Sequence, residues 1–231
     1  MPLYFLPAVQ QLRGKFIVFD GNEGCGKSTQ AAMARDRLQQ LGLSVLLVRD
    51  PGSTRIGEQI RQILLNPEHT EMGMRCEMLL YMAARAQMMH ELISPALEQG
   101  KVVISDRFIS STLAYQLGGD GLTAAEIRAV GDIAIKHRWP DLTIILDLPV
   151  ERSAARVRPK FTLFPDDPEA GVKKDRIEMR SMAYHEQVRQ NYLRQARDRR
   201  HKYKVINADR EPDQVHADVW RALEQLCRSS G

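Results

Sequence analysis

The stretch KFIVFDGNEGCGKST, residues 15–29, is the most informative segment of this chain. An apolar, β-branched run at 15–20 predicts a strand, and the pattern G-x-x-x-x-G-K-[ST] from Gly21 to Ser28 follows it directly. In such a loop, backbone N–H groups surround phosphate oxygens at the point where a helix begins. The order of strand, glycine-rich loop and helix therefore predicts a phosphate-binding loop in an α/β protein.

The residue types within this loop fit the binding of phosphate and of a divalent cation. Gly21 and Gly26 permit a close approach of the backbone. Lys27 can reach the outer phosphates of a nucleotide, and the Ser28 hydroxyl is a ligand for Mg²⁺. The candidate phosphate-binding residues are Gly21, Asn22, Glu23, Gly24, Cys25, Gly26, Lys27, Ser28 and Thr29.

Cys25 stands inside this loop, close to the start of the following helix, where a thiolate is favoured. Two interpretations of this residue remain open. It is either a small side chain tolerated at a variable position or a redox-sensitive group. Slow labelling by an alkylating reagent would favour the first interpretation.

The rest of the chain repeats the alternation of strand and helix. Short β-branched runs predict strands at 15–20, 44–50, 101–106, 141–148 and 203–207. Helical patterns occur at 27–41, 56–65, 71–98, 110–115, 124–137, 176–198 and 212–227. Such alternation is typical of a parallel sheet with helices on both faces. We therefore predict one domain over residues 15–231 around a five-stranded parallel sheet, preceded by an extension of residues 1–14.

Length and composition fit a single globular domain. The chain has 231 residues, of which 43% are hydrophobic, which suffices for one sizeable core and is short for two. It contains no apolar run of about 18 residues, so we expect no membrane anchor. The three cysteines, Cys25, Cys76 and Cys227, are odd in number and lack metal-ligand spacing, which favours a reducing cytoplasm.

Positive charge is concentrated late in the chain. Between Arg152 and Lys204 there are 15 Lys plus Arg against 7 Asp plus Glu, although the net charge of the whole chain is only +4. Within this segment, residues 158–174 combine three prolines with mixed charge and little periodicity. Long irregular loops are usually functional lids or linkers, so we expect a mobile lid over about 152–175. Such a basic segment suits nucleic acid, an anionic membrane or the phosphates of a small ligand.

A second motif, KVVISDRF, ends the strand predicted at 101–106. Asp106 lies at the carboxyl tip of this strand, at the edge where α/β sheets bind ligands, so it can face a metal directly or through water. The neighbouring Arg107 can clamp a second phosphate with two hydrogen bonds. A guanine-reading N/T-K-x-D element, which a GTP-binding switch requires, does not occur. The two motifs together favour a kinase.

Five stretches, in this order, resemble the thymidylate kinase family: DGNEGCGKST, VRDPGST, EMLLYMAARAQ, SDRFISSTLAYQ and DRIE. The resemblance runs from about Lys15 to the C-terminus. It implies a P-loop NTPase fold, and a Mg²⁺-dependent transfer of the γ-phosphate of ATP to dTMP for dTTP synthesis. It further implies a cytoplasmic homodimer with ATP and dTMP as small-molecule substrates, and neither a nucleic-acid partner nor a membrane.

The same resemblance implies roles for residues around the nucleoside. It places Tyr81 over the thymine ring, where the family keeps a Phe. Arg85 and Thr112 fall at positions that contact the edge of the base. Tyr115 and Gln116 fall where the family closes over the sugar, which would reject a 2′-hydroxyl by crowding.

For the phosphates and the metal, the resemblance gives Arg107 the dTMP phosphate, together with the region around Arg49. Glu23 matches a family acid near the 3′-hydroxyl and the acceptor phosphate. The implied metal ligands are Ser28, Asp20 and Asp106.

Some family members carry a catalytic arginine in the phosphate-binding loop, but this chain has Gly24 there. Others supply arginines from the lid, where Arg156 is the first candidate, before Arg158 and Arg176. Closure of the lid would bring this charge to the γ-phosphate and exclude water. The expected catalytic residues are Lys27, Arg107, Arg156, Arg158 and Arg176.

The chain also departs from the family. Asp50 replaces a common Glu, Ser53 replaces a Gly, and the adenine contacts are expected only broadly, at residues 207–213. Three alternatives stay open. The protein could phosphorylate another nucleoside monophosphate such as dUMP or dGMP, act as a nucleotide-dependent regulator, or bind nucleic acid through its basic segment. The acids within that segment and its lack of interleaved aromatics disfavour the last alternative.

Overall fold

The computed structural model describes residues 9–156 and 175–228. Residues 157–174 lie outside the described residues, and with them most of the expected lid, including Arg158. Residues 1–8 of the N-terminal extension also lie outside. Its remaining residues form a short 3₁₀ turn at Gln10–Leu12, with Val9 and Leu12 buried against the domain.

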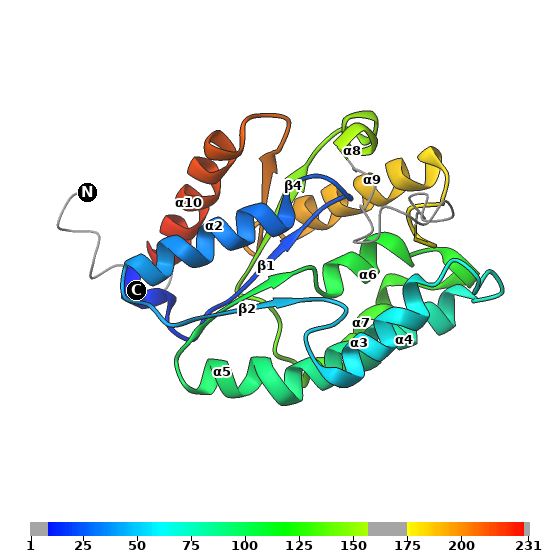
Figure 1. Ribbon diagram of the computed structural model, residues 1–231, viewed down its shortest axis with the longest axis horizontal. Coiled ribbons are helices and arrows are strands. Elements are labelled where there is room, and N and C mark those ends of the chain that lie inside the picture. The colour runs from blue at the N-terminus through cyan, green and yellow to red at the C-terminus, as the bar shows by residue number, and fades with distance from the viewer. Residues whose placement is uncertain (1–8, 157–174, 229–231) are drawn as a thin grey trace, which may run out of the picture.

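Five parallel strands form one sheet, as the sequence predicts (Figure 1). The strands are β1 (Phe16–Asp20), β2 (Val45–Arg49), β3 (Val102–Asp106), β4 (Leu142–Asp147) and β5 (Tyr203–Asn207). Their order across the sheet is β2-β3-β1-β4-β5, with parallel pairing throughout. Every residue of β1 and β3 is buried, as expected of central parallel strands covered on both faces. The predicted α/β fold class is confirmed.

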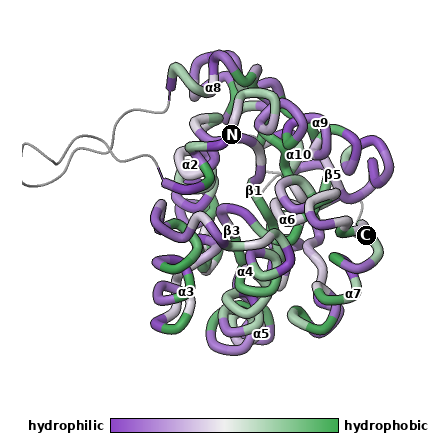
Figure 2. The backbone as a smooth tube through the Cα atoms, turned by 90° about the vertical axis from the view of Figure 1, so that its right-hand side faces the viewer, coloured by the Kyte–Doolittle hydropathy of each residue, from purple (hydrophilic) through white to green (hydrophobic). Residues whose placement is uncertain are grey.

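Helices cover both faces of the sheet (Figure 1). They are α2 (Lys27–Gln40), α3 (Arg55–Leu65), α4 (Met74–Met88), α5 (Ser94–Glu98), α6 (Ile109–Tyr115), α7 (Ala124–Ile135), α8 (Val150–Arg156), α9 (Met182–Asp198) and α10 (Pro212–Arg228). One apolar cluster lies between the sheet and α2 with α10, and another lies between the sheet and α4 to α7. Figure 2 shows β1 as an apolar strand enclosed by helices of alternating hydropathy. None of the described helices combines the length and apolarity that a membrane span requires.

The single helix predicted over 71–98 is wrong in detail. Helix α4 begins at Met74, and a π-helical turn at Met89–Ile93 separates it from α5. Pro95 stands in the first turn of α5. A proline has no N–H to donate, and its ring clashes with the carbonyl four residues earlier, so a regular α-helix cannot continue through it. The π-helical turn at Met89–Ile93, which is wider than an α-helical turn, lies directly before α5 and separates it from α4.

The helix predicted over 176–198 is also shorter than expected. It begins at Met182 because Ser181 caps it, accepting a hydrogen bond from the Tyr184 backbone N–H at 3.2 Å. Residues 175–180 instead form turns. The sequence patterns do not predict α8 (Val150–Arg156), because most of its residues fall within the lid expected over about 152–175.

The topology brings three chemically important residues to one edge of the sheet. Asp20, Arg49 and Asp106 end β1, β2 and β3 respectively. The register pairs Arg49 with Asp106 and Phe19 with Asp106. Because the carboxyl ends of parallel strands share an edge, segments far apart in sequence converge there.

Candidate active site

The phosphate-binding loop connects β1 to α2, and its glycines are required by geometry. Gly21 has φ 136°, and a Cβ at this position would lie 2.5 Å from the Leu146 carbonyl oxygen. Gly26, with φ 95°, precedes α2 in the left-handed region. The Lys27 ammonium donates to the Asn22 carbonyl oxygen at 2.7 Å, which holds the lysine along the loop.

Cys25 is buried in the core cluster beneath this loop. Burial raises the pKa of its thiol, and the nearby Lys27 ammonium only partly opposes this effect. The neutral thiol is therefore favoured, in contrast to the thiolate that proximity to a helix terminus suggests. The structure supports the interpretation of Cys25 as a small packing residue.

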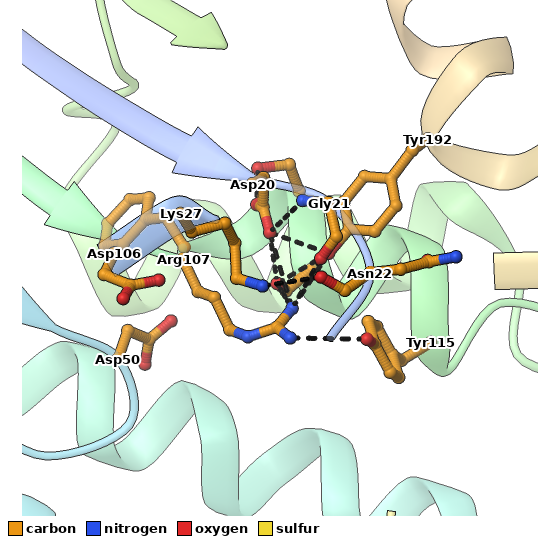
Figure 3. A network of polar contacts seen from close by, with 12 residues as sticks. Asp20, Gly21, Asn22, Lys27, Asp50, Asp106, Arg107, Tyr115 and Tyr192 are labelled. Atoms are coloured by element: carbon orange, nitrogen blue, oxygen red, sulfur yellow. Dashed lines mark hydrogen bonds and ion pairs between the residues drawn. The ribbon is translucent and has the colours of Figure 1, made fainter. Parts of the chain in front are cut away.

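Asp20 lies at the centre of a buried hydroxyl network (Figure 3). Its carboxylate accepts hydrogen bonds from Ser110 at 2.5 Å, Ser111 at 2.6 Å and Tyr192 at 2.7 Å. The Arg107 guanidinium lies 3.7 Å from the same carboxylate. Burial raises the pKa of Tyr192, so its hydroxyl stays protonated and able to donate. These contacts tie β1 to α6 and α9.

The other two predicted metal ligands pair with each other. The Ser28 hydroxyl donates to the Asp106 carboxylate, so one alcohol oxygen and one carboxylate oxygen lie side by side. Oxygen ligands of this kind suit Mg²⁺, which usually binds through one or two protein oxygens together with substrate phosphates. Within the described residues, no three His, Cys, Asp or Glu side chains form a metal centre. Asp20 differs from Ser28 and Asp106, because its carboxylate is surrounded by the three hydroxyl groups that donate to it.

Arg107 has an unusual backbone conformation at the end of β3. Its φ is 72°, in the left-handed region that non-glycine residues rarely adopt. Hydrogen bonds from the Arg107 N–H to Phe19 O (2.9 Å) and from Ser105 Oγ to Arg107 O (2.7 Å) hold this conformation. The guanidinium contacts Glu23 Oε1 at 2.5 Å and Gly21 O at 3.2 Å. Strained conformations that are held so firmly concentrate at functional sites.

Arg85 lies at the base of a second, more apolar region. It forms a buried ion pair with Asp50, with Nε and Oδ2 2.6 Å apart. It also donates to Thr112 Oγ1 at 2.6 Å and Phe108 O at 2.9 Å. Burial raises the pKa of Asp50, although the Arg85 charge opposes the rise. The Tyr81 ring centroid lies 5.5 Å from the Arg85 guanidinium carbon.

A cavity of about 440 Å³ joins the loop to this region, a size within the usual range for small-molecule sites. Most of the predicted binding residues line it together. They are Glu23, Gly24, Gly26, Lys27, Ser28, Thr29, Arg49, Tyr81, Arg85, Asp106, Arg107, Thr112, Tyr115 and Gln116. Segments predicted separately from four motifs thus form one site.

Two of the predicted catalytic arginines point elsewhere. Arg156 donates to Ala208 O at 3.0 Å and to Asp209 Oδ1 at 3.4 Å, within the segment expected to contact adenine. Arg176 donates to Leu64 O at 3.0 Å and pairs with Glu77. Neither arginine is among the described residues that line the cavity.

The turn after β2 contains Ser53, one of the expected departures from the family pattern. Ser53 has φ 64°, and its hydroxyl accepts from Arg49 N (2.8 Å) and donates to Arg49 O (3.1 Å). The Arg49 side chain reaches Glu58 at 3.2 Å. Glu58 also accepts from Ser53 N, and this hydrogen bond lowers the pKa of its carboxyl.

Sequence reasoning missed several residues of this site. Arg61 lines the cavity and donates to Pro51 O at 3.0 Å, and burial lowers the pKa of its guanidinium. Asp175, Ile177 and Glu178 also line it. These three residues belong to the DRIE stretch that carries the family resemblance, but only Arg176 of that stretch was given a role. No local motif marks Arg61, because only tertiary packing brings it to the cavity.

Comparison with known proteins decides the family. The sequence model of thymidylate kinases matches residues 19–219. The chain belongs to the thymidylate kinase family. The resemblance inferred from its motifs is thereby confirmed.

Several thymidylate kinases are similar to this chain over nearly their full lengths. The thymidylate kinase of Halothermothrix orenii is 43% identical over 213 residues, which cover 92% of this chain and 98% of that protein. The thymidylate kinase of Syntrophotalea carbinolica is 42% identical, with 89% and 93% covered. The crystal structure of the Ehrlichia chaffeensis thymidylate kinase matches with a TM-score of 0.70 at 27% identity, covering 92% of this chain and 99% of that one.

Proposed function

We propose that this protein transfers the γ-phosphate of ATP to dTMP, giving dTDP and ADP. One observation carries the proposal. A single cavity joins a phosphate-binding loop, through Lys27 and Ser28, to Arg107 and to an aromatic pocket around Tyr81 and Arg85. Membership of the thymidylate kinase family supports the choice of substrates.

At the donor end of the cavity, backbone N–H groups of residues 21–29 surround the phosphates of ATP, and Lys27 neutralises their outer charge. The residues that would hold Mg²⁺ are Ser28 and Asp106, whose oxygens already lie together. When bound, Mg²⁺ supplies further charge neutralisation at the transferred phosphoryl group. We assign Asp20 a supporting role behind this site, because its carboxylate is occupied by three hydroxyl groups.

At the acceptor end, Arg107 binds the dTMP phosphate with help from Arg49. The guanidinium of Arg107 is already held beside the loop, with Glu23 as a carboxylate partner. An incoming phosphate would share this guanidinium with Glu23, which then lies near the nucleotide 3′-hydroxyl. Since the acceptor phosphate is already anionic, positioning and charge neutralisation carry most of the catalysis, and a strong base is not required.

The base lies between Tyr81 and the edge formed by Arg85 and Thr112. Burial raises the pKa of the Tyr81 hydroxyl, so the ring is neutral when it stacks on a base. Tyr115 and Gln116 close the sugar side of the cavity.

The lid arginines supply charge at the γ-phosphate on closure. Arg156 is the one that we place at the ATP end, supported by its hydrogen bonds to Ala208 and Asp209 in the segment expected to contact adenine. Arg158 and Arg176 remain further candidates. This proposal retains one domain over residues 15–231 with a lid at about 152–175.

We also propose a cytoplasmic homodimer. Three methionines of α4, Met78, Met82 and Met88, are buried in the core and are not available to an interface. Instead, the packed helices α3 and α4 expose three large apolar side chains, Ile56, Ile63 and Leu79. Sedimentation at several concentrations would test the dimer, and a monomer throughout would reject it. The three free cysteines fit a reducing compartment.

A coupled assay of ADP release with ATP and Mg²⁺ tests the proposed function. Offered separately at matched concentrations, dTMP should be used at least about tenfold faster than dUMP, dGMP, dCMP or AMP, a difference of about 1.4 kcal/mol in transition-state binding. Preference for another monophosphate would keep the kinase and overturn the base pocket. Absence of any acceptor-dependent ADP would favour a nucleotide-binding regulator.

A further inference from the structure

Tyr192 on α9 is a buried tyrosine that contacts Arg107 but is not among the described residues that line the cavity. Its hydroxyl donates to Asp20 Oδ1 at 2.7 Å, and Arg107 Nη1 donates to the same hydroxyl at 3.3 Å. A carboxylate only accepts hydrogen bonds, so the single hydroxyl proton is directed to Asp20 and a lone pair is left for Arg107. Tyr192 can therefore act on a bound nucleotide only through its neighbours.

The packing of α9 against α6 fixes the place of this hydroxyl. Asn191 and Gln195 lie on either side of Tyr192 in the sequence of α9, and both are buried. Asn191 donates to Ala114 O at 2.9 Å, and Gln195 donates to Ser110 O at 3.1 Å. Because both bonds tie α9 to the backbone of α6, the Tyr192 hydroxyl has little freedom to move.

One side of the Arg107 guanidinium is held in the buried network (Figure 3). Its Nη1 donates to Gly21 O at 3.2 Å, to Ser111 Oγ at 3.2 Å and to Tyr192 Oη. The Asp20 carboxylate, which accepts from both Ser111 and Tyr192, lies 3.7 Å from Nη1 and is fully buried. These groups form a fixed set of acceptors for Nη1.

The other side of the guanidinium faces the cavity. Its Nη2 donates to Glu23 Oε1 at 2.5 Å and to Tyr115 Oη at 3.4 Å, and both of these residues line the cavity. The Glu23 side chain is 38% exposed, so a ligand can displace it. Among the hydrogen bonds of the described residues, none uses Arg107 Nε. The Nε–Nη2 edge is thus the one that a phosphate can take with two parallel hydrogen bonds.

We propose that Tyr192 is a positioning residue for the acceptor phosphate. By holding Nη1 in the buried network, its hydroxyl turns the Nε–Nη2 edge of Arg107 toward the nucleotide. Tyr192 reaches the guanidinium from α9, whereas Gly21 and Ser111 reach it from the loop and from α6. This inference rests on the proposed dTMP site, and it adds a residue that acts without touching the substrate.

The substitution Tyr192→Phe tests the inference, because it keeps the ring and removes only the hydroxyl. Thymidine lacks the phosphate, so the ratio of the thymidine and dTMP dissociation constants measures what the phosphate adds to binding. Titration calorimetry should show this ratio falling at least about threefold in the variant. In kinetic assays, KM for dTMP should rise by a similar factor, while KM for ATP stays within twofold. An unchanged ratio in folded Tyr192→Phe protein would overturn the inference.

Ser110→Ala is the matched control. Ser110 is buried and also donates to Asp20, at 2.5 Å, but none of the hydrogen bonds of the described residues joins it to Arg107. Its thymidine-to-dTMP ratio should equal that of the native protein. An equal fall in both variants would mean that Tyr192 acts only by supporting Asp20, and the inference would be wrong.

A double-mutant cycle shows whether the effect passes through Arg107. In an Arg107→Ala background, Tyr192→Phe should change the thymidine-to-dTMP ratio less than about twofold, because the guanidinium that it positions is absent. An undiminished effect in this background would contradict the inference. If the native protein fails to phosphorylate dTMP, the proposed function fails instead, so the two failures are distinguishable.

A measurement on the native protein decides the matter if Tyr192→Phe does not fold. In arginine-selective ¹⁵N-labelled protein, the Arg107 Nη1 protons should show a nuclear Overhauser effect to the Tyr192 ring protons, both without nucleotide and at saturation with dTMP. Loss of this contact on binding of dTMP would show that Tyr192 does not hold the guanidinium in the complex and would overturn the inference.

Discussion

Arg107 follows β3, contacts the phosphate-binding loop, and lies on the side of the site that we propose binds the acceptor. Its guanidinium contacts Gly21 and Glu23 of the loop, Ser111 and Tyr115 of α6, and Tyr192 of α9. Figure 3 shows the Arg107 side chain extending toward Gly21, Tyr115 and Tyr192. A cation held by five residues from three segments needs little reorganisation when a phosphate arrives. We therefore regard it as a preorganised anion clamp.

Replacing Arg107 should separate the two substrates. Arg107→Ala removes charge-assisted hydrogen bonds worth about 1.5–3 kcal/mol each, so KM for dTMP should rise at least about tenfold and kcat should fall. KM for ATP should change less than threefold. Steady-state kinetics with each substrate varied in turn checks this. An unchanged KM for dTMP would remove Arg107 from the acceptor site.

Arg156 should show the complementary pattern. It touches Ala208 and Asp209, away from the base pocket, so Arg156→Ala should lower kcat and raise KM for ATP while leaving KM for dTMP within twofold. The same kinetic measurements on one preparation allow a direct comparison with Arg107→Ala. A normal kcat would leave Arg158 or Arg176 as the catalytic arginine.

The cysteines should differ in reactivity. Cys76 is exposed, whereas Cys25 and Cys227 are buried, and burial raises the pKa of both buried thiols. Because the thiolate is the reactive form, iodoacetamide at pH 8 should label Cys76 first. Mass spectrometry of a time course identifies the labelled residue. Labelling of Cys25 as fast as Cys76 would restore the redox interpretation.

At the level of elements, the turn between β2 and α3 shows how a departure from a family pattern is accommodated. The left-handed backbone of Ser53 costs about 1–2 kcal/mol relative to glycine. Two hydrogen bonds between its hydroxyl and the Arg49 backbone offset part of this cost. Ser53 therefore stabilises the turn in a way that alanine cannot.

Two substitutions at this position separate strain from hydrogen bonding. Ser53→Ala and Ser53→Gly lose the same hydroxyl, but only glycine relieves the backbone strain. Urea denaturation should therefore show that Ser53→Ala lowers the free energy of unfolding by about 1 kcal/mol more than Ser53→Gly does. Equal stabilities of the two variants would mean that the left-handed backbone carries no cost here.

Elements also show where sequence patterns were insufficient. Apolar periodicity runs unbroken from 71 to 98, yet Pro95 and the π-helical turn at Met89–Ile93 divide the helix. Periodicity records which face is buried and is insensitive to a local change of helical pitch. The helix predicted over 176–198 starts later than expected for a different reason, because Ser181 is an ordinary N-capping residue that the apolar periodicity does not reveal.

For the molecule as a whole, the sheet was predictable because parallel strands require helical crossovers, and these impose a visible alternation on the sequence. The binding residues in motifs that follow strands were predictable because the carboxyl ends of parallel strands lie at one edge of the sheet. Tyr192 was not, since it reaches Asp20 across 172 residues of chain. Glu77 was equally hidden, because a buried carboxylate in an apolar helix acquires its partners only through packing.

We propose that one cavity brings the two phosphate sites close enough for direct transfer. The first experiment is incubation with ATP labelled at the γ-phosphate, Mg²⁺ and dTMP, followed by chromatography. With direct transfer, the label should appear in dTDP at the same rate as ADP forms, and omission of dTMP should abolish most of the ADP. Release of the label as inorganic phosphate, independent of dTMP, would show hydrolysis of ATP and would overturn the proposed function.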